Sequence, residues 1–427
     1  MEVHYSMDSC FKKQILNIIS NTKHELYIMA FEISDDDVIN EINNLLIKNL
    51  NVYIIVDKHC REYMKRLHSK CKICVKTDRL FHHKIMIIDS NIVVTGCSNL
   101  HRNSVMGNDD EYIIKIQNEE IVTFYKQLYL FYVYGTSAPT YISNVCPYII
   151  DIWVDNKEIL DNTMKYICNA KNSIIIMHFW MTYRPIMDLL IEKAKSVKVH
   201  VLLDKRSFER DNREYNGTNV GNACEYLYVN NVDLRIIDRK LFHYKVILID
   251  DTFVILGSKN FYTESINTFH DDCVVYNNKE TYDIFYNHYL QLINKYPTYC
   301  YKEWNLHIFC EKNKVNKSNL CIVGSHLLQK MQIRKSNDID FILTTKERDR
   351  LKFPRHNKAV TKYNEVVSYH WHPVNSDDEL ISNSELHTIL PNGFKICTLK
   401  MLRDKKVKHN REKDIHDVNS IDAYLSR

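Results

Sequence analysis

A short pattern occurs twice in this chain, and it constrains the fold more than any other feature of the sequence. Residues 82–89 read H-x-K-x4-D, and residues 243–250 read the same pattern 161 positions later. A glycine turn follows each copy at the same offset, at residues 96–99 and 257–260. Five residue types that recur at one constant spacing indicate an internal duplication, so we predict two copies of one structural unit.

Length and composition limit the classes of protein to consider. A chain of 427 residues is too long for one ordinary hydrophobic core, so two or three domains are expected. The net charge of +4 permits a local basic groove but does not by itself indicate a nucleic-acid partner. No apolar run approaches the roughly 20 residues of a membrane span, and residues 1–5 lack the layout of a signal peptide. We therefore expect a cytoplasmic protein whose 13 cysteines are reduced.

Apolar patterning alternates helices and strands within each copy. The first copy has predicted buried strands at residues 26–31 and 52–57, and the second has their counterparts at 173–179 and 197–204. A polar insertion at residues 206–220 is either a lid over the site or a passive surface loop. The pattern predicts an α/β fold, in which two tandem mixed-sheet repeats precede a small α/β domain. The predicted domains are residues 1–145, 146–302 and 303–427.

Strand geometry selects one histidine in each motif. Neighbouring side chains of a strand point to opposite faces, so His82 shares a face with Lys84 while His83 points away. The same rule pairs His243 with Lys245. The aspartates of the motifs lie at the ends of these strands, where we expect a supporting role for Asp89 and Asp250.

Both copies resemble the phospholipase D superfamily, whose signature is H-x-K-x4-D followed by G-S-x-N. The resemblance covers residues 1–296, and its one departure is Cys97, which replaces the serine that the second copy keeps as Ser258. It implies a pseudodimer in which the two motif strands meet and form one active site without a metal or other cofactor. One histidine would form a phosphohistidine, for which family precedent favours His82, and the other would protonate the leaving oxygen.

The residue types suit attack on a phosphodiester. Its negative charge repels nucleophiles, so lysine and asparagine side chains would neutralise and hydrogen-bond the phosphoryl oxygens. An imidazole serves as nucleophile or acid near neutral pH, and a carboxylate should orient it. Asp110 and Asp271, again 161 residues apart, are the expected carboxylates, with Glu111 and Asp272 as alternatives. The predicted catalytic residues are His82, Lys84, Asn99, Asp110, His243, Lys245, Asn260 and Asp271, supported by Ser258.

The last third of the chain carries a different pattern. Gly324 and Ser325 end a predicted strand, and Asp338 and Asp340 share one face of the next strand. This arrangement places a phosphate-binding turn beside two carboxylates that can hold Mg²⁺. It resembles the nucleotidyltransferase fold of the DNA polymerase β type, which implies nucleotide binding at the turn and a metal at the two aspartates.

This second resemblance has a departure. The family has a third carboxylate on a later strand, but the predicted strand carries His370 and His372, and Glu365 is the nearest acid. The alternative is therefore a degenerate domain that only binds nucleotide, RNA or a partner.

The sequence as a whole predicts a metal-independent phosphodiesterase. Nucleic acid is the favoured substrate, because the repeats are compact and nuclease-like and a nucleotide-handling domain follows them. A phospholipase or phosphatidyltransferase acting on lipid head groups is one alternative, and a catalytically silent binding scaffold is another. Hydrolysis and transfer to a hydroxyl group are both left open. We expect a monomer, since the two repeats complete one site.

Overall fold

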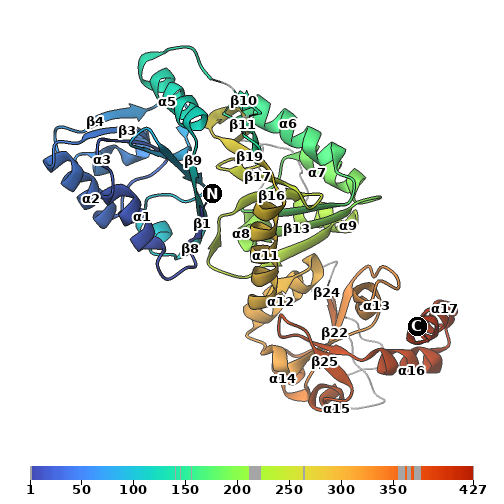
Figure 1. Ribbon diagram of the computed structural model, residues 1–427. Helices are drawn as coiled ribbons and strands as arrows, with labels where there is room; N and C mark the ends of the chain where they lie inside the picture. Colours follow the sequence, from blue (N-terminus) through green and yellow to red (C-terminus); the bar gives the residue numbers. More distant parts are fainter. Residues whose placement is uncertain are drawn as a thin grey trace. The chain divides into compact units, whose positions relative to one another are not determined.

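The computed structural model divides the chain into two compact units, Met1–Leu292 and Ile293–Arg427. The first unit contains both histidine motifs (Figure 1). Most of the insertion predicted at residues 206–220 lies outside the described residues. The structure describes residues 2–139, 141–144, 146–154, 156–210, 223–262, 265–353, 361–362, 367–369 and 377–426.

The first repeat is a mixed sheet of seven strands. They are β1 (Glu2–Tyr5), β2 (Glu25–Ala30), β3 (Asn51–Asp57), β4 (Lys72–Lys76), β6 (Lys84–Ile88), β7 (Ile92–Gly96) and β9 (Tyr112–Gln117). The sheet has the order β1-β9-β7-β6-β2-β3-β4. Strands β2, β3 and β4 are parallel, whereas β6, β7, β9 and β1 alternate in direction. The first motif therefore opens a central strand, β6.

Helices cover both faces of this sheet (Figure 1). The cap of α2 is Asp35, whose carboxylate accepts hydrogen bonds from two backbone N–H groups of the first turn. Helix α5 begins after the cap Asn118 and ends at Gly135, which has the left-handed φ of 68° that favours glycine. Apolar residues of α1 and α2 form one hydrophobic core with alternate residues of β2 and β3. The helices are α1 (Phe11–Ser20), α2 (Asp36–Ile47), α3 (Arg61–Met64), α4 (Arg102–Val105) and α5 (Glu119–Tyr134).

The second repeat has the same plan. Its strands are β10 (Tyr141–Ser143), β11 (Ile149–Trp153), β12 (Ser173–His178), β13 (Lys198–Asp204), β14 (Asp233–Ile237), β16 (Lys245–Ile249), β17 (Phe253–Gly257) and β19 (Cys273–Asn277). Within the first unit they follow the order β10-β11-β19-β17-β16-β12-β13-β14. This order matches that of the first repeat, with β10 added at one edge. The expected α/β fold with tandem mixed-sheet repeats is confirmed.

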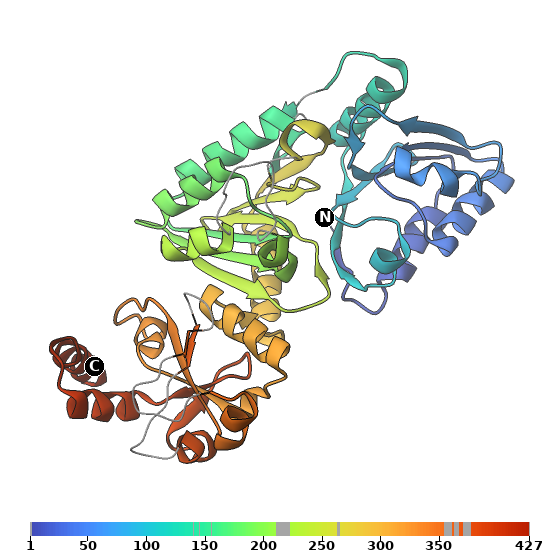
Figure 2. The same cartoon turned by 180° about the vertical axis from the view of Figure 1, so that it is seen from behind.

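The helices of the second repeat also lie where the first repeat has its own. Helices α6 and α7 pack against each other on one side of the sheet, as the view from behind shows clearly (Figure 2). The helices are α6 (Asn156–Asn169), α7 (Arg184–Lys193), α8 (Lys205–Arg210), α9 (Ala223–Val229), α10 (Ser265–Thr268) and α11 (Lys279–Lys295).

Two short parallel bridges join the repeats. Strand β5 (Leu80–Phe81), just before the first motif, pairs with β18 (Phe269–His270) of the second repeat. Strand β15 (Leu241–Phe242), just before the second motif, pairs with β8 (Asp109–Asp110) of the first repeat. Each bridge thus ties the start of one motif to the acidic segment of the other repeat.

The second unit is a smaller α/β structure. Its main strands are β21 (Leu320–Val323), β22 (Ile339–Leu343), β23 (Thr361–Lys362), β24 (Val367–Tyr369), β25 (His387–Ile389) and β26 (Lys395–Cys397). They form a mixed sheet in the order β23-β24-β22-β21-β26-β25. Its helices are α12 (Tyr301–Asn313), α13 (His326–Lys330), α14 (Thr345–Arg350), α15 (Asp377–Ser382), α16 (Leu399–His409) and α17 (Glu412–Leu425).

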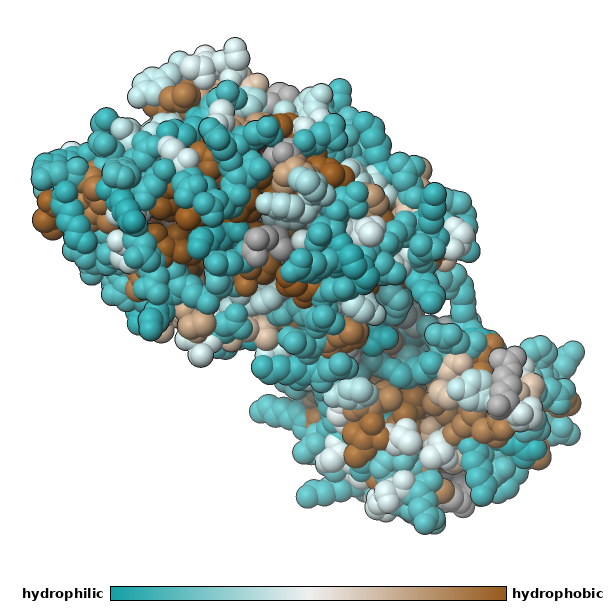
Figure 3. Space-filling model, in the orientation of Figure 1, coloured by the Kyte–Doolittle hydropathy of each residue, from teal (hydrophilic) through white to brown (hydrophobic). Residues whose placement is uncertain are grey.

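The surface of both units is largely polar. Figure 3 shows hydrophilic side chains over most of the visible face of each unit, with apolar side chains in smaller groups. Among the described residues, no helix has both the length and the apolar character needed to span a membrane. All 13 cysteines are free thiols.

Candidate active site

Each motif histidine is held by a carboxylate from the other repeat. His82 Nδ1 lies 2.7 Å from Asp271 Oδ1, and His243 Nδ1 lies 2.6 Å from Glu111 Oε1. All four side chains are buried. A carboxylate accepts hydrogen bonds, so Nδ1 of each ring carries a proton, and Nε2 is the nitrogen left for chemistry.

The backbone repeats this crossed arrangement. The N–H of His82 donates to the carbonyl of His270 at 3.0 Å, and the N–H of His243 donates to the carbonyl of Asp110 at 2.9 Å. The two parallel bridges that join the repeats position both histidines in this way. The site therefore exists only where the two repeats meet.

The carboxylate that contacts His243 is Glu111, which the sequence offered as the alternative to Asp110. Glu111 occupies the place predicted for Asp110, because the spacing between the repeats changes from 161 to 160 residues in this segment. Gly96 pairs with Ile113, whereas its counterpart Gly257 pairs with Cys273. One additional residue in the first repeat thus lies between the asparagine of the glycine turn and the acidic segment. The structural counterpart of Asp271 is consequently Glu111.

Asp110 has a different partner. Its Oδ2 lies 2.8 Å from Nε of Arg239, at the start of the segment that leads into the second motif. Burial raises the pKa of Asp110 to about 7, although the charge of Arg239 opposes this shift. The Asp110 side chain therefore forms an ion pair with Arg239 beside the second motif and does not contact His243.

Each motif lysine contacts the backbone of the histidine in its own motif. Lys84 Nζ donates to the carbonyl of His82 at 2.7 Å, and Lys245 Nζ donates to that of His243 at 2.9 Å. Both are buried, and burial lowers the pKa of Lys84 to about 8 and that of Lys245 to about 7. A buried cation with a lowered pKa gains most from an anionic ligand, which restores its charge.

The histidines respond to the same burial. Burial, followed by the charge of Lys84, lowers the pKa of His82 to about 3. Burial and the charge of Lys245 likewise hold the pKa of His243 well below its usual range. Each lysine also acts on the histidine of the other motif, so the two halves adjoin.

Aromatic rings line each half. The ring of Phe31 lies 5.6 Å from that of His82 and 5.7 Å from Lys84 Nζ. The ring of Phe179 lies 5.1 Å from that of His243 and 5.6 Å from Lys245 Nζ. Apolar walls of this kind keep water from the cations and strengthen their attraction for a phosphoryl group.

The asparagines of the glycine turns are buried at the same site. Asn99 Oδ1 and Asn260 Oδ1 lie in the interior without a hydrogen-bond partner. Their turns depend on glycine, because a Cβ on Gly96 would lie 2.5 Å from a carbonyl oxygen and a Cβ on Gly257 would lie 2.1 Å from another. The buried amides are available to a ligand that provides a donor or an acceptor.

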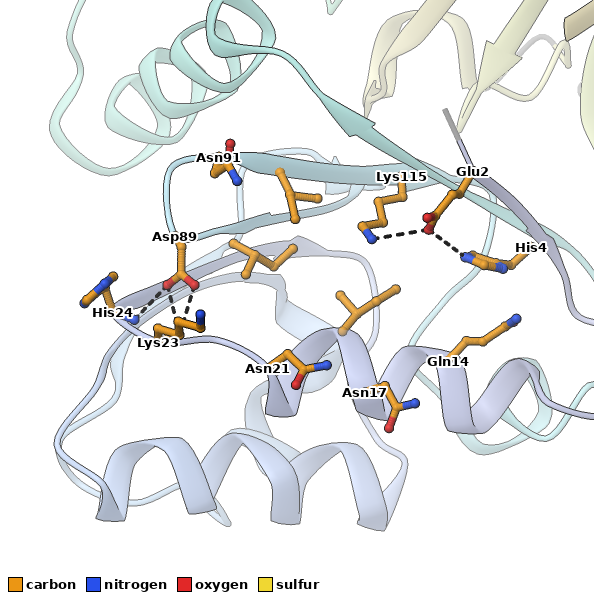
Figure 4. Close-up of a pocket in the computed structure, with 13 residues that line it drawn as sticks. Glu2, His4, Gln14, Asn17, Asn21, Lys23, His24, Asp89, Asn91 and Lys115 are labelled. Atoms are coloured by element: carbon orange, nitrogen blue, oxygen red, sulfur yellow. Dashed lines mark hydrogen bonds and ion pairs between the residues drawn. The ribbon is translucent and has the colours of Figure 1, made fainter. Parts of the chain in front are cut away.

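The motif aspartates support the backbone. Asp89 accepts hydrogen bonds from the N–H groups of Lys23, His24 and Glu25. Asp89, Lys23 and His24 also line the surface pocket drawn in Figure 4. Asp250 accepts three equivalent bonds from Lys171, Asn172 and Ser173. These residues fix the turns before β2 and β12 and do not reach the histidines.

The two halves differ around their carboxylates. Asp271 Oδ1 accepts a second hydrogen bond from Ser258 Oγ at 2.9 Å, and Asp271 Oδ2 lies 3.3 Å from the buried Nζ of Lys259. Burial alone would raise the pKa of Asp271, but the charges of Lys259 and His82 outweigh it and hold that pKa well below its usual range. Asp271 is therefore a permanent anion.

Among the described residues Glu111 has no ion pair with a lysine, although Ser104, Ser98 and the charges of His101 and Lys245 act to lower its pKa. The counterparts of Ser258 and Lys259 are Cys97 and Ser98, and Cys97 bonds to the backbone of Tyr112 instead. Within the described residues Glu111 forms an ion pair with His243 alone. Burial raises its pKa, so the His243–Glu111 pair holds a second proton more readily than the His82–Asp271 pair.

The neighbouring residues of each motif point elsewhere. His83 bonds to Asp272 at 3.1 Å and to Tyr132 at 2.9 Å, and Tyr244 bonds to His288 at 2.7 Å. The side chains of His82 and His83 therefore point to opposite sides, as the strand pattern predicts. Asp272 consequently contacts His83 and is not the partner of either motif histidine.

The predicted nucleotide site of the second unit brings its residues together. Gly324 has the left-handed φ of 75°, and a Cβ there would lie 2.5 Å from Asp340 Oδ2. Asp338 and Asp340 act on the buried Lys302, whose pKa burial lowers. Ser325 Oγ lies 2.9 Å from Oγ of Ser336.

The position for a third carboxylate is occupied by serine. Ser368 on β24 lies in register beside Asp340, and it is buried. Glu365, His370 and His372 lie outside the described residues. In the described part of the chain, neither Asp338 nor Asp340 belongs to a cluster of three or more His, Cys, Asp or Glu side chains close enough to hold one metal ion.

One other group in the described residues has the spacing of metal ligands, formed by Cys300, Glu303 and His326. Glu303 already accepts hydrogen bonds from Lys330 Nζ at 2.6 Å and Asn392 Nδ2 at 2.8 Å. An ammonium group thus neutralises the carboxylate, so the cluster is better explained as a buried structural network.

Three residues of the site were not predicted from the sequence. Lys259 was unassigned, although it stands inside the second glycine turn. Phe31 and Phe179 directly follow β2 and β12, which match between the repeats, and this match was the available signal. Glu111 was named only as an alternative, and the signal that favours it was the pair of helix caps Asn118 and Asn278, which are 160 residues apart.

Comparison with known proteins finds a matching family model and two related proteins. Residues 15–129 and 163–293 match the family model described as cardiolipin synthase, PLD-like domain. The phospholipase D of Rickettsia conorii is 28% identical over 124 residues, which are 28% of this chain and 62% of that protein. The phospholipase D of Rickettsia felis has the same identity and coverage. The chain thus spans 62% of the length of the curated relatives that it matches.

Among similar solved structures, one with a TM-score above 0.5 shares the fold. Phosphatidylserine synthase from Haemophilus influenzae Rd KW20 has a TM-score of 0.54 and 12% identity, over 70% of this chain and 86% of its own. Nuc from Salmonella typhimurium, a phospholipase D family member, has a TM-score of 0.31 and 25% identity, over 35% of this chain and 97% of its own.

Proposed function

The chain belongs to the family of cardiolipin synthase, PLD-like domains, and we propose that it is a metal-independent phosphodiesterase that cleaves nucleic acid through a phosphohistidine intermediate. The observation that carries this proposal is the pair of crossed histidine–carboxylate contacts, with two lysines and two asparagines around them. Because one chain completes both pairs, we propose that it acts as a monomer.

His82 is the nucleophile in this proposal. The Asp271 carboxylate orients its ring and favours a proton on it, but burial and the charge of Lys84 outweigh this effect, while Lys259 balances part of the charge of Asp271. His82 therefore stays neutral near pH 7, with a free lone pair on Nε2. A neutral imidazole is the form that attacks phosphorus.

His243 is the general acid and base. Glu111 forms no ion pair with a lysine among the described residues, and burial outweighs the charges of His101 and Lys245 and raises its pKa, so the proton that the pair holds can be placed on His243 as an imidazolium next to an ionised Glu111. Two titratable pairs with different proton affinities provide an acid and a base within one site.

The reaction follows from these roles. His82 Nε2 bonds to phosphorus as the bond from phosphorus to the leaving oxygen breaks, and His243 Nε2 gives its proton to that oxygen. A water molecule then attacks the phosphohistidine, His243 takes its proton, and the bond from phosphorus to His82 breaks. Lys84, Lys245 and the amides of the asparagines stabilise the charge on the phosphoryl oxygens in both steps. An alcohol in place of water would give transfer instead of hydrolysis.

Two candidate functions differ in their substrate, which is either a nucleic acid or a lipid. The proteins similar to this chain include phospholipase D and phosphatidylserine synthase, and their names support the lipid as the second candidate. We favour a nucleic acid strand, because the site is followed by a unit with a nucleotide-type turn and carboxylates.

Labelled single-stranded DNA and RNA, incubated in EDTA, test this proposal. Cleavage that is lost in His82→Ala and His243→Ala supports it, since the mechanism needs no metal. Intact strands together with release of head groups from phospholipid vesicles would select the lipid candidate. Inertness on both substrate classes would leave only a binding scaffold and contradict the proposal.

We also propose that the second unit is nucleotidyltransferase-like and binds a nucleotide at Gly324 and Ser325 without transferring it. The close approach of Gly324 to Asp340 supports a phosphate turn beside the carboxylates, where Asp338 and Asp340 would hold Mg²⁺ with the phosphates. Ser368 at the third position argues against transfer.

Fluorescent ATP titration with Mg²⁺ tests this second proposal. Binding should weaken at least roughly tenfold in Asp340→Asn, which removes a charged ligand of the cation. No binding to the unaltered chain would overturn it, and incorporation of labelled AMP into RNA or protein would overturn the absence of transfer.

A further inference from the structure

A basic cavity adjoins the first half of the active site. It has a volume of about 410 Å³, and its lining includes Lys58, His59, Arg79 and Phe269. Phe269 is the link to the reaction centre, because its ring lies 5.4 Å from the ring of His82. Whatever occupies this cavity is therefore next to the proposed nucleophile.

Two cations of this cavity, Lys58 and Arg79, are exposed. Neither forms an ion pair within the described residues. The acid in the lining, Asp78, is paired with Lys76 at 3.5 Å and with His270 at 3.5 Å. Two positive charges therefore remain available to an anion.

One of the two equivalent positions in the second repeat is neutralised. Lys205, the counterpart of Lys58, lies 2.9 Å from Asp238, and the first repeat has Thr77 in place of that aspartate. Lys240, the counterpart of Arg79, is exposed and donates to Asn108 Oδ1 at 3.1 Å. The two repeats therefore share a fold here but differ in charge at the position of Lys58.

The cavity also offers an aromatic surface. Phe269 is half-buried, and it faces the same space as the cations. The exposed ring of His59 lies 6.2 Å from that of Phe31, which itself contacts His82. Cations next to aromatic rings are the combination that binds single-stranded nucleic acid, since the cations hold the phosphate and the rings stack on the base.

We propose that this cavity binds the nucleotide next to the scissile phosphodiester, with its phosphate on Lys58 and Arg79 and its base against Phe269. The strand would then continue on the side of the first repeat, which fixes its direction through the site. This inference rests on the proposed cleavage of nucleic acid and adds the place where the neighbouring nucleotide binds. A substrate with a single phosphate would leave the cavity empty.

A comparison of two substrates tests the proposal. The variant Lys58→Ala/Arg79→Ala should lose about tenfold or more in kcat/KM on a single-stranded oligonucleotide. The slope of log(kcat/KM) against log salt concentration should become less negative by about one, because the contacts of two cations with the strand are lost. Hydrolysis of bis(p-nitrophenyl) phosphate should change less than about twofold, because one phosphate does not reach the cavity. The matched control Lys205→Ala/Lys240→Ala should leave both rates near those of the unaltered chain.

Binding provides a measurement that does not need turnover. Fluorescence anisotropy of a labelled oligonucleotide with His82→Ala should show weaker binding when Lys58 and Arg79 are also replaced. Equal losses on both substrates, or unchanged oligonucleotide cleavage and binding, would overturn the proposal. Dependence of vesicle head-group release on the two cations, with no effect on oligonucleotides, would assign the cavity to lipid instead. Hydrolysis of the small diester independent of His82 would instead contradict the proposed function.

Discussion

The two halves of the active site have the same frame and different charges. Both place a histidine against a carboxylate of the opposite repeat, with a lysine and an aromatic ring beside it. The first histidine faces Asp271, which Ser258 and Lys259 support, whereas the second faces Glu111, which has neither neighbour. A duplicated fold has thus kept its geometry while its charge environment has diverged, and divergence of this kind can give equivalent residues different roles.

The largest effect should come from the histidines and should differ between them. His82→Ala removes the proposed nucleophile, so we expect a loss of roughly 10⁴-fold or more with every diester. His243→Ala removes the proposed acid, so it should retain much more activity on bis(p-nitrophenyl) phosphate, whose leaving group needs no proton, than on an oligonucleotide. Steady-state rates with both substrates check this. Equal losses for both variants on both substrates would mean that the halves are functionally equivalent.

Lys259 should determine how much more weakly His82 binds a proton than His243 does. Replacing it with methionine leaves Asp271 as an unbalanced anion, which favours a proton on His82. The acid limb of the kcat/KM profile should therefore move up by about one pH unit or more, since an opposite charge at close range shifts a pKa by that amount.

The substitution of Lys259 also removes one partner of a buried ion pair, so some loss of stability is expected. A melting experiment measures that loss separately. A lower Tm with an unchanged acid limb would show a purely structural role for Lys259. Lys126→Met serves as a control because it removes one partner of an ion pair, with Glu25, that includes none of the proposed catalytic residues.

The lysines predict how activity falls at high pH. Burial lowers the pKa of Lys84 to about 8 and that of Lys245 to about 7, so their charges are present below these values and are lost as pH rises through them. We expect kcat/KM to decline above about pH 7 to 8 because the uncharged amines no longer attract the diester. A profile that stays level to pH 10 would contradict the lowered pKa values.

The smallest effect should come from Cys97. Cys97→Ser would place a hydroxyl near Glu111, as Ser258 does for Asp271, and so make the two halves more alike. One additional hydrogen bond contributes about 1 kcal/mol, so kcat on an oligonucleotide should fall by less than about fivefold. A larger loss, measured at constant Tm, would indicate a direct role for the thiol.

Much of the first unit could be predicted from its sequence. The repeated motif determined the tandem α/β fold, and the alternation of a strand separated His82 from His83. The crossed contacts were not predictable in detail, because short bridges between distant segments position the carboxylates. One additional residue in a loop was enough to replace Asp110 by Glu111, and a constant offset does not reveal such a change.

The charge differences were harder to read. Lys58 and Lys205 are the same residue type at equivalent positions, yet in the described part of the chain only the second has a carboxylate partner, which depends on Asp238 in a different loop. A sequence lists charges without their pairing. In the second unit, the third carboxylate of the predicted nucleotide site was missing from the sequence as well, and Ser368 lies at that position.

The central claim is that the two halves have separate roles, and covalent trapping tests it most directly. Glu111→Gln should slow hydrolysis of the intermediate, because His243 would be a weaker base. After reaction with bis(p-nitrophenyl) phosphate and an alkaline quench, which preserves phosphohistidine, peptide mass spectrometry locates the adduct. The account predicts an adduct on His82 and none on His243. An adduct on His243, or turnover with no adduct on either histidine, would contradict it.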